Sequence, residues 1–106
     1  MKCKITVIKR LYHKDLCEEY CSLNLPESFT GCPFFKVGQE FIVEGHNQVP
    51  ANFCAWAWAD IQKDVLTMMF GGSFPWTKQK GINITCCTDG LMPVIFKVEK
   101  IETNIE

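Results

Sequence analysis

The sequence predicts an α+β fold in which a small, mostly antiparallel sheet of about four strands packs against one long helix. Three observations lead to this prediction. Two short segments in the first half of the chain alternate apolar and polar residues, and a longer central segment repeats apolar residues at helical spacing. The last part of the chain has the alternation and the central Asp-Gly pair of a β-hairpin.

The first two predicted strands are residues 3–9 and 39–44. In each of them one face can be buried while the other faces water, because successive side chains point to opposite faces. The inward positions are expected to be Cys3, Ile5, Val7, Phe41 and Val43. Between these strands, residues 13–23 predict a short helix, and residues 25–38 contain the prolines and glycines of an irregular loop.

Residues 52–70 predict the long helix, with Asn52 as its N-cap and Gly71-Gly72 at its C-terminus. Helical projection places a set of apolar side chains on one arc, which we expect to face the sheet. The arc consists of Phe53, Cys54, Ala57, Trp58, Ile61, Val65, Met68 and Met69. Trp56 projects instead toward the polar side, one turn before Asp60.

The C-terminal hairpin has two registers that its turn residues allow. A two-residue Asp89-Gly90 turn would mix apolar and polar faces. A three-residue loop, Thr88 to Gly90, keeps one apolar face and places Gly90 at a left-handed bulge position, so this register is preferred. It pairs Ile82 with Phe96, Ile84 with Val94, and Cys86 with Met92.

Composition excludes several classes of protein. The 106 residues are enough for a single domain, 1–106, and 47% of them are hydrophobic while 22% are charged, as in a packed globular protein. A net charge of -1 argues against nucleic-acid and membrane-surface binding. No apolar run approaches the roughly 20 residues of a membrane span, and the N-terminus lacks the apolar stretch of a signal peptide. We therefore expect a cytoplasmic protein.

Seven cysteines are the unusual feature of the composition. An odd number without an export signal favours free or metal-bound thiols over disulfides. Cys3, Cys54 and Cys86 fall on inward positions, where they are either small buried hydrophobes or thiolates that converge on a metal. Cys17 and Cys21 are four apart, a spacing that suits two ligands of one metal, although two ordinary thiols on a polar helix are favoured.

Two further cysteines are the candidates for reactivity. Cys32 precedes a proline in a glycine-bounded turn, and Cys87 is expected on the polar or interface side of its strand, so both have the least apolar surroundings. Cys86 and Cys87 are neighbours in a strand and therefore point to opposite faces. If the cysteines bind zinc or iron, the expected ligands are Cys32, Cys54, Cys86 and Cys87.

Three tryptophans are many for a chain of this length. Trp58 is expected in the core. Trp56 and Trp76 are expected either at an interface between subunits or in the wall of a small-molecule pocket. Asp60 is a candidate acid or base of such a pocket if it is buried. Asp89 is a candidate polar anchor, although a turn-forming role explains it more simply.

Several of these motifs also occur together in a known family. The chain resembles a group of small bacterial and archaeal proteins, of uncharacterised activity, in three segments: Trp56 to Ile61, Gly71 to Trp76 and Cys86 to Val94. The resemblance extends to Cys32-Pro33 and to residues 38–41. It implies a single domain and an intracellular setting, largely in anaerobes, and it supplies no catalytic residue.

Three functional hypotheses follow. The first is a thiolate-based metal or redox site, in which Cys32 and Cys87 would be the reactive thiols. The second is a small-molecule binder or enzyme whose cleft is lined by Trp56, Trp76 and Asp60, completed by a second subunit if the protein is a homodimer. The third is a partner-binding module without chemistry, which would bury an exposed aromatic patch on association.

Overall fold

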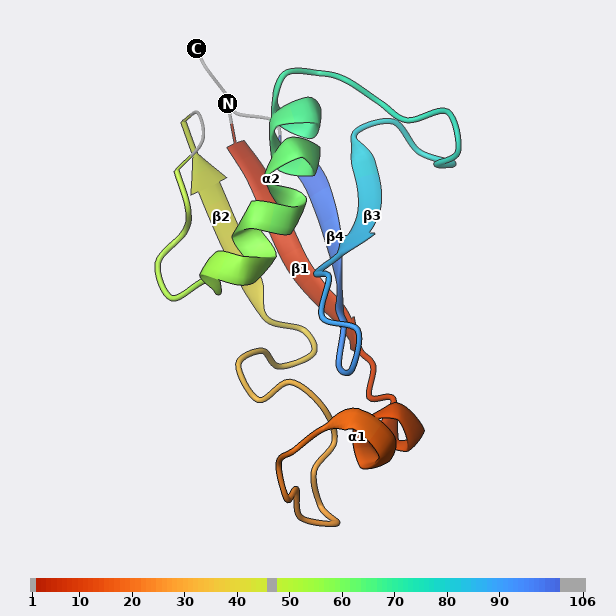
Figure 1. Cartoon of the computed structure of the whole chain (residues 1–106). Helices are drawn as coiled ribbons and strands as arrows, with labels where there is room; N and C mark the ends of the chain where they lie inside the picture. Colours follow the sequence, from red (N-terminus) through yellow and green to blue (C-terminus); the bar gives the residue numbers. More distant parts are fainter. Residues whose placement is uncertain (1, 46–47, 102–106) are drawn as a thin grey trace.

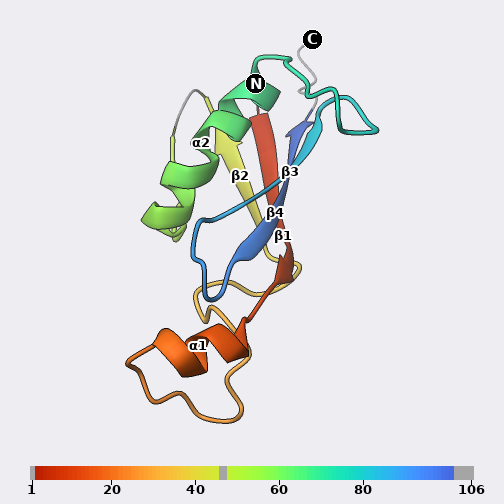
Figure 2. The same ribbon diagram turned by 45° about the vertical axis from the view of Figure 1, so that its right-hand side comes forward.

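The computed structural model describes residues 2–45 and 48–101, and it confirms the predicted fold class (Figure 1). The elements are β1 (Lys2–Arg10), α1 (Lys14–Tyr20), β2 (Glu40–Glu44), α2 (Ala55–Met69), β3 (Ile82–Cys86) and β4 (Val94–Ile101). The four strands form one antiparallel sheet in the order β2-β1-β4-β3. Helix α2 lies across one face of this sheet (Figures 1 and 2).

Helix α1 and the loop that follows it lie beyond one end of the sheet, away from α2 (Figures 1 and 2). The molecule is therefore elongated, with extents of 54 × 29 × 21 Å. The hydrogen bonds from Leu11 N to Pro93 O (2.8 Å) and from His13 N to Leu91 O (2.8 Å) connect the start of this segment to the loop between β3 and β4. We call residues 11–34 the α1 lobe.

The core lies between α2 and the sheet, and the inward positions predicted for the first two strands are all buried. The predicted helical arc is also confirmed: Ala57, Ile61, Val65, Met68 and Met69 are buried, and Cys54 and Trp58 pack against the core from its border. Burying each large side chain of this kind stabilises the fold by about 1.5–3 kcal/mol.

The predicted N-cap of the long helix is wrong. Asn52 has a left-handed backbone (φ 62), and α2 begins at Ala55 with Cys54 in the N-cap position. The two intervening residues place the Phe53 ring in the core before the helix starts. At the other end, Gly71 (φ 84) has the left-handed conformation that the sequence predicted after the helix.

The predicted register of the C-terminal hairpin is also wrong. Ile82 pairs with Glu99 and Ile84 with Lys97, and the connection from β3 to β4 is longer than three residues. Gly90 has no positive φ. The shift leaves the inward side of β4 as predicted, with Val94, Phe96 and Val98 buried, but it turns the other face of β3 toward the core. Ile84 and Cys86 are consequently exposed, and Asn83 and Cys87 are buried.

A buried carboxylate explains why the polar face of β3 is inside. Asp64 of α2 is only 4% exposed, and it accepts hydrogen bonds from Asn83 Nδ2 (2.9 Å) and Thr85 Oγ1 (2.8 Å). Lys63 Nζ lies 3.0 Å from the second carboxylate oxygen. These donors replace the water that Asp64 loses on burial, so the polar side chains of β3 face the helix and not the solvent.

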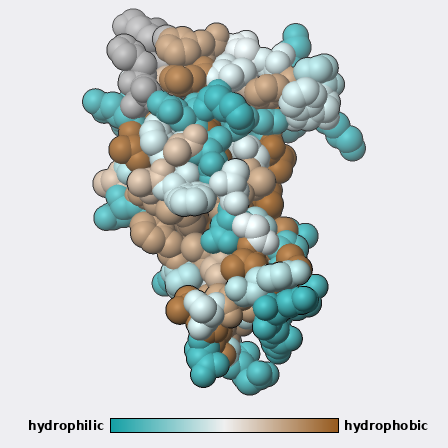
Figure 3. Space-filling model, in the orientation of Figure 1, coloured by the Kyte–Doolittle hydropathy of each residue, from teal (hydrophilic) through white to brown (hydrophobic). Residues whose placement is uncertain are grey.

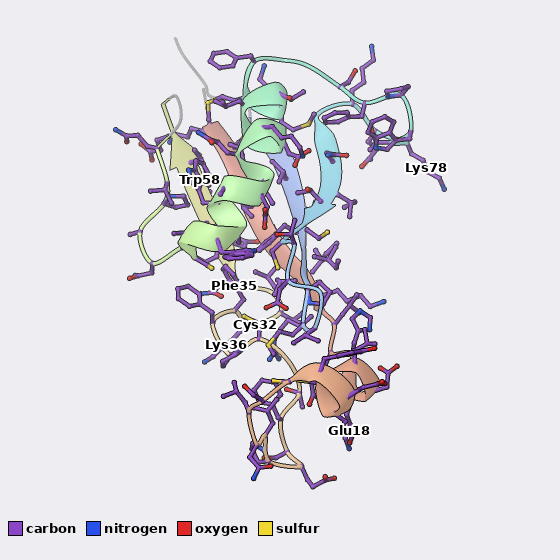
Figure 4. The ribbon with its side chains drawn as sticks, in the orientation of Figure 1. Glu18, Cys32, Phe35, Lys36, Trp58 and Lys78 are labelled. Carbon is purple, nitrogen blue, oxygen red and sulfur yellow. The ribbon has the colours of Figure 1, made fainter. Side chains whose placement is uncertain are left out.

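Four phenylalanines join the α1 lobe to the core. Phe35, the residue directly after the lobe, is 2% exposed and has ring contacts with Phe41 (6.0 Å between centroids), Phe53 (5.2 Å) and Phe96 (5.2 Å). These partners come from β2, from the segment just before α2 and from β4. Phe35 and the neighbouring Cys32 lie between the sheet and α1 (Figure 4).

Candidate functional site

The four predicted metal ligands do not form one set. Cys86 is exposed on the face of β3 that points away from α2, whereas Cys87 is buried in the core. Cys32 and Cys54 are half-buried against the core border. The predicted convergence of Cys86 with inward cysteines is therefore wrong, because the hairpin register reverses the faces of β3. Within residues 2–45 and 48–101, no three His, Cys, Asp or Glu side chains are grouped to hold a metal ion.

The two cysteines predicted to be reactive have structural contacts. Cys87 is 8% exposed, its N–H donates to Val94 O (3.1 Å), and its sulfur accepts from Val94 N (3.3 Å). Its predicted place on the polar side of the strand is therefore wrong. Cys32 is half-buried, and its carbonyl accepts a hydrogen bond from Arg10 Nε (3.0 Å), which fixes the turn before Pro33.

Cys3 is confirmed as a core residue, and its thiol donates a hydrogen bond to Val65 O (3.5 Å). Burial raises the pKa of the Cys3 thiol from 9.0 to about 11, while the Lys100 charge opposes the rise.

The raised pKa of Cys3 predicts a loss of stability at alkaline pH. The unfolded thiol ionises first, so the stability that this group contributes is complete below about pH 9 and decreases as pH rises toward about 11. Urea unfolding at about pH 8 and about pH 10 should show a smaller alkaline loss of stability in Cys3→Ala. An equal loss in both proteins would contradict this assignment.

Trp56 and Asp60 meet at the loop after β3. The Trp56 Nε1–H donates to Thr88 Oγ1 (2.9 Å), and the Thr88 hydroxyl lies 3.0 and 3.1 Å from the Asp60 carboxylate oxygens. Thr88 N also donates to Asp60 (2.8 Å). Trp56 and Thr88 are exposed and Asp60 is half-buried, so this network connects the first turns of α2 to the β3–β4 loop at the surface. The sequence placed Trp56 beside Asp60 correctly, but it gave no sign of Thr88.

Trp76 does not share a site with Trp56. Trp56 lies in the first turn of α2 and Trp76 lies beyond its other end, and the helix between them is about 22 Å long at 1.5 Å per residue. Trp76 is 72% exposed and stacks on Phe74 with 5.0 Å between ring centroids. The two tryptophans therefore do not line a single cleft within one chain. Asp89 is the turn former: its Oδ1 accepts from Leu91 N (2.9 Å) and Met92 N (3.1 Å).

The α1 lobe contains Cys17 and Cys21, which the sequence indicated were two ordinary thiols on a polar helix. Cys17 is on α1 and is 4% exposed, and Cys21 follows the helix in an extended conformation and is half-buried. Cys21 N donates to Cys17 O (2.9 Å), which holds the two residues on one side of the last helical turn. The side chains of Cys21 and Tyr12 lie close enough to the Cys17 sulfur to affect its pKa by hydrogen bonding.

Both thiols line a hollow of about 340 Å³ between α1 and the loop after it. Tyr12 and Phe29 meet edge-on across the lobe, with 5.2 Å between ring centroids, and Lys14 Nζ lies 3.5 Å from Glu27 Oε1. Glu18, which also lines the hollow, is marked on α1 in Figure 4. The hollow therefore has an aromatic wall and a charged rim, with the two sulfur atoms beside them.

The electrostatics of the pair separate the roles of the two thiols. Burial raises the pKa of the Cys17 thiol, and the hydrogen bond and charge of Cys21 raise it further. The hydrogen bond from Tyr12 acts in the opposite direction, because a donor stabilises a thiolate. Cys17 is thus a protonated thiol at neutral pH, next to a sulfur that is more accessible to an incoming molecule.

The four-residue spacing was the signal in the sequence for this pair, but the hollow depends on the loop that folds over α1.

Within the described residues, no helix is both long enough and apolar enough to cross a membrane. Comparison of the chain with protein-family models, curated proteins and solved structures finds no match.

Proposed function

We propose that the protein is a thiol redox protein whose centre is the Cys17–Cys21 pair. The observation that supports this most directly is the position of the two thiols, which lie together at the end of α1 and both line a hollow that an outside molecule can enter. Two cysteines this close can form a disulfide with a small movement, since residues four apart on a helix have neighbouring Cβ atoms. Cys21 lies just after the helix, so its backbone is not held in helical geometry.

The reaction that fits the pair is exchange with an external disulfide, R–S–S–R. The Cys21 sulfur, after losing its proton, attacks one sulfur of that disulfide, and the released R–S⁻ takes up a proton. The Cys17 thiol then loses its proton and attacks Cys21, which forms the Cys17–Cys21 bond and expels the second R–S⁻. Overall, two protein thiols are oxidised, one disulfide is reduced, and two R–SH leave.

The assignment of roles follows from exposure. Cys21 is half-buried and can be reached from the hollow, whereas Cys17 is buried. A buried thiol with a raised pKa is a poor first nucleophile, because the thiolate is the attacking species. Cys17 can still act in the second step, because its target, the Cys21 sulfur of the mixed disulfide, is already held next to it.

Oxidised glutathione is a suitable probe for the test, with mass spectrometry after acid quenching and alkylation. The native protein should lose two thiols together and give one peptide that contains a Cys17–Cys21 bond. Cys17→Ser should stop at a mixed disulfide on Cys21, and Cys21→Ser should remain reduced in the lobe. Each outcome follows from the order of attack described above.

Cys86→Ser is the matched control, because Cys86 is exposed but lies on the sheet and not in the lobe. This variant should form the Cys17–Cys21 bond at the native rate. The proposal is overturned if the probe modifies Cys86 and leaves Cys17 and Cys21 reduced, or if Cys17→Ser traps no mixed disulfide.

A further inference from the structure

Strand β3 forms one edge of the sheet, and its backbone shows which groups are left for a partner. Cys87 N donates to Val94 O (3.1 Å), and Lys100 N donates to Gly81 O (2.8 Å), so it is the odd-numbered residues 81–87 whose backbone groups form the hydrogen bonds with β4. Alternate residues of an antiparallel strand direct their N–H and C=O groups to opposite sides. Ile82, Ile84 and Cys86 therefore direct theirs away from β4, toward the open edge.

The other edge of the sheet, β2, is protected in a way that β3 is not. Strand β2 begins and ends with Glu40 and Glu44, whose carboxylates lie 3.6 Å from Lys4 Nζ and 3.7 Å from Lys2 Nζ. Charged residues on an edge strand disfavour pairing with another chain. Strand β3 has the sequence Ile-Asn-Ile-Thr-Cys, without a charge or a proline, and Ile84 at its centre is 49% exposed.

Apolar residues reach the surface along this margin, where Figure 3 shows them in brown beside the position of β3. A hollow of about 560 Å³ adjoins the same strand and is lined by Trp76, Lys78, Ile82 and Ile84 among others. Lys78 lies on the loop that precedes β3 (Figure 4). The strand and the hollow together form a partly apolar groove along the free edge.

We propose that β3 is the interface of a homodimer, in which two copies pair antiparallel through this edge about a two-fold axis at Ile84. Ile84 then faces Ile84 of the partner subunit, and Ile82 faces Cys86 of the partner subunit. These are the residues whose backbone groups point outward, so each outward N–H meets a C=O across the axis. The two sheets join into one continuous sheet, and no charged residue of β3 opposes the pairing.

Charges at the two ends of β3 favour the antiparallel direction. Lys78 and Lys80 precede the strand, and Asp89 follows it. Antiparallel pairing brings the start of one strand beside the end of the other, so the lysines of one copy lie toward the acidic turn of its partner. Opposite charges across an interface fix orientation, and their attraction weakens as salt screens it.

Proline substitution at the two edges tests the proposal. Ile84→Pro removes one outward N–H from β3, and Ile42→Pro does the same on β2. Val7 N donates to Gln39 O, so odd-numbered residues of this segment hydrogen-bond to β1 and the N–H of Ile42 points to the open edge. Ile42 is 42% exposed, close to the exposure of Ile84, so the two variants are matched. Sedimentation under reducing conditions should give a dimer for the native protein and Ile42→Pro, and a monomer for Ile84→Pro.

Ile84→Glu keeps the test decisive if Ile84→Pro does not fold. It places two carboxylates next to each other on the two-fold axis, while Lys97 lies opposite within the same chain. This variant should be monomeric at neutral pH and should recover the dimer when acid protonates the carboxylates. A native protein that is monomeric at every concentration overturns the proposal, and so does a folded Ile84→Glu that stays dimeric at neutral pH. None of these outcomes depends on Cys17 or Cys21.

Discussion

Phe35→Ala is expected to destabilise the protein by about 4 kcal/mol, as truncation of a fully buried phenylalanine does. The Phe35 ring is 2% exposed and contacts Phe41, Phe53 and Phe96 edge-on or tilted. Its removal leaves a cavity among rings that come from three different segments of the chain and cannot all close on it. The loss is measured as the difference in unfolding free energy from urea titration followed by circular dichroism.

Phe34→Ala is the matched control for this experiment. The neighbouring Phe34 touches Phe35 edge-on at 5.2 Å but is 53% exposed, so its truncation should cost about 1 kcal/mol or less. If the two variants are destabilised equally, Phe35 is not the residue that joins the α1 lobe to the core. A lobe that detaches in Phe35→Ala should also expose Cys17 to alkylation, since burial of this thiol depends on the fold of the lobe.

Asp64→Ala is expected to destabilise the protein by about 3 kcal/mol. The Asp64 carboxylate accepts from Asn83 Nδ2 and Thr85 Oγ1, and the alanine would leave both donors facing a nonpolar space. Asn83 is 4% exposed, so water cannot easily replace the lost acceptor. Urea unfolding measures the loss, and hydrogen exchange should show that β3 opens before the other strands.

Asp60→Ala provides the control on the same helix. The Asp60 carboxylate binds Thr88 at the surface, where water can replace it, so about 1 kcal/mol is expected. Asp64→Asn should fall between the two alanine variants, because its amide oxygen still accepts one of the two hydrogen bonds. A loss in Asp64→Ala no larger than in Asp60→Ala would mean that the buried network does not determine the position of β3.

Asp64 also explains why the buried face of β3 was predicted wrongly. It lies three residues after Ile61 and four before Met68, which places it on the buried arc of the helix. A carboxylate at such a position calls for donors on the facing element. Asn83 and Thr85 alternate on β3 and supply them, but an assignment that places only apolar residues inside selects Ile82 and Ile84 instead.

The cysteine predictions also depended on whether local alternation or the hairpin register determined each position. Cys3 could be placed in the core because its strand alternates clearly, and the structure confirms it. The positions of Cys86 and Cys87 followed from the hairpin register, and an error in that register exchanged their surroundings. Their opposite orientations were nevertheless predicted correctly, since they depend only on the geometry of a strand.

The sequence by itself determined the α+β class, the inward residues of β1 and β2, and the buried face of α2. These features depend on periodicities of two and 3.6 residues, which local geometry imposes on any segment. Only the tertiary structure decided the register of β3, the separation of Trp56 from Trp76 and the hollow beside Cys17 and Cys21. Each of these depends on which groups meet across space, and loop length and buried hydrogen bonds determine that without leaving a periodic pattern in the chain.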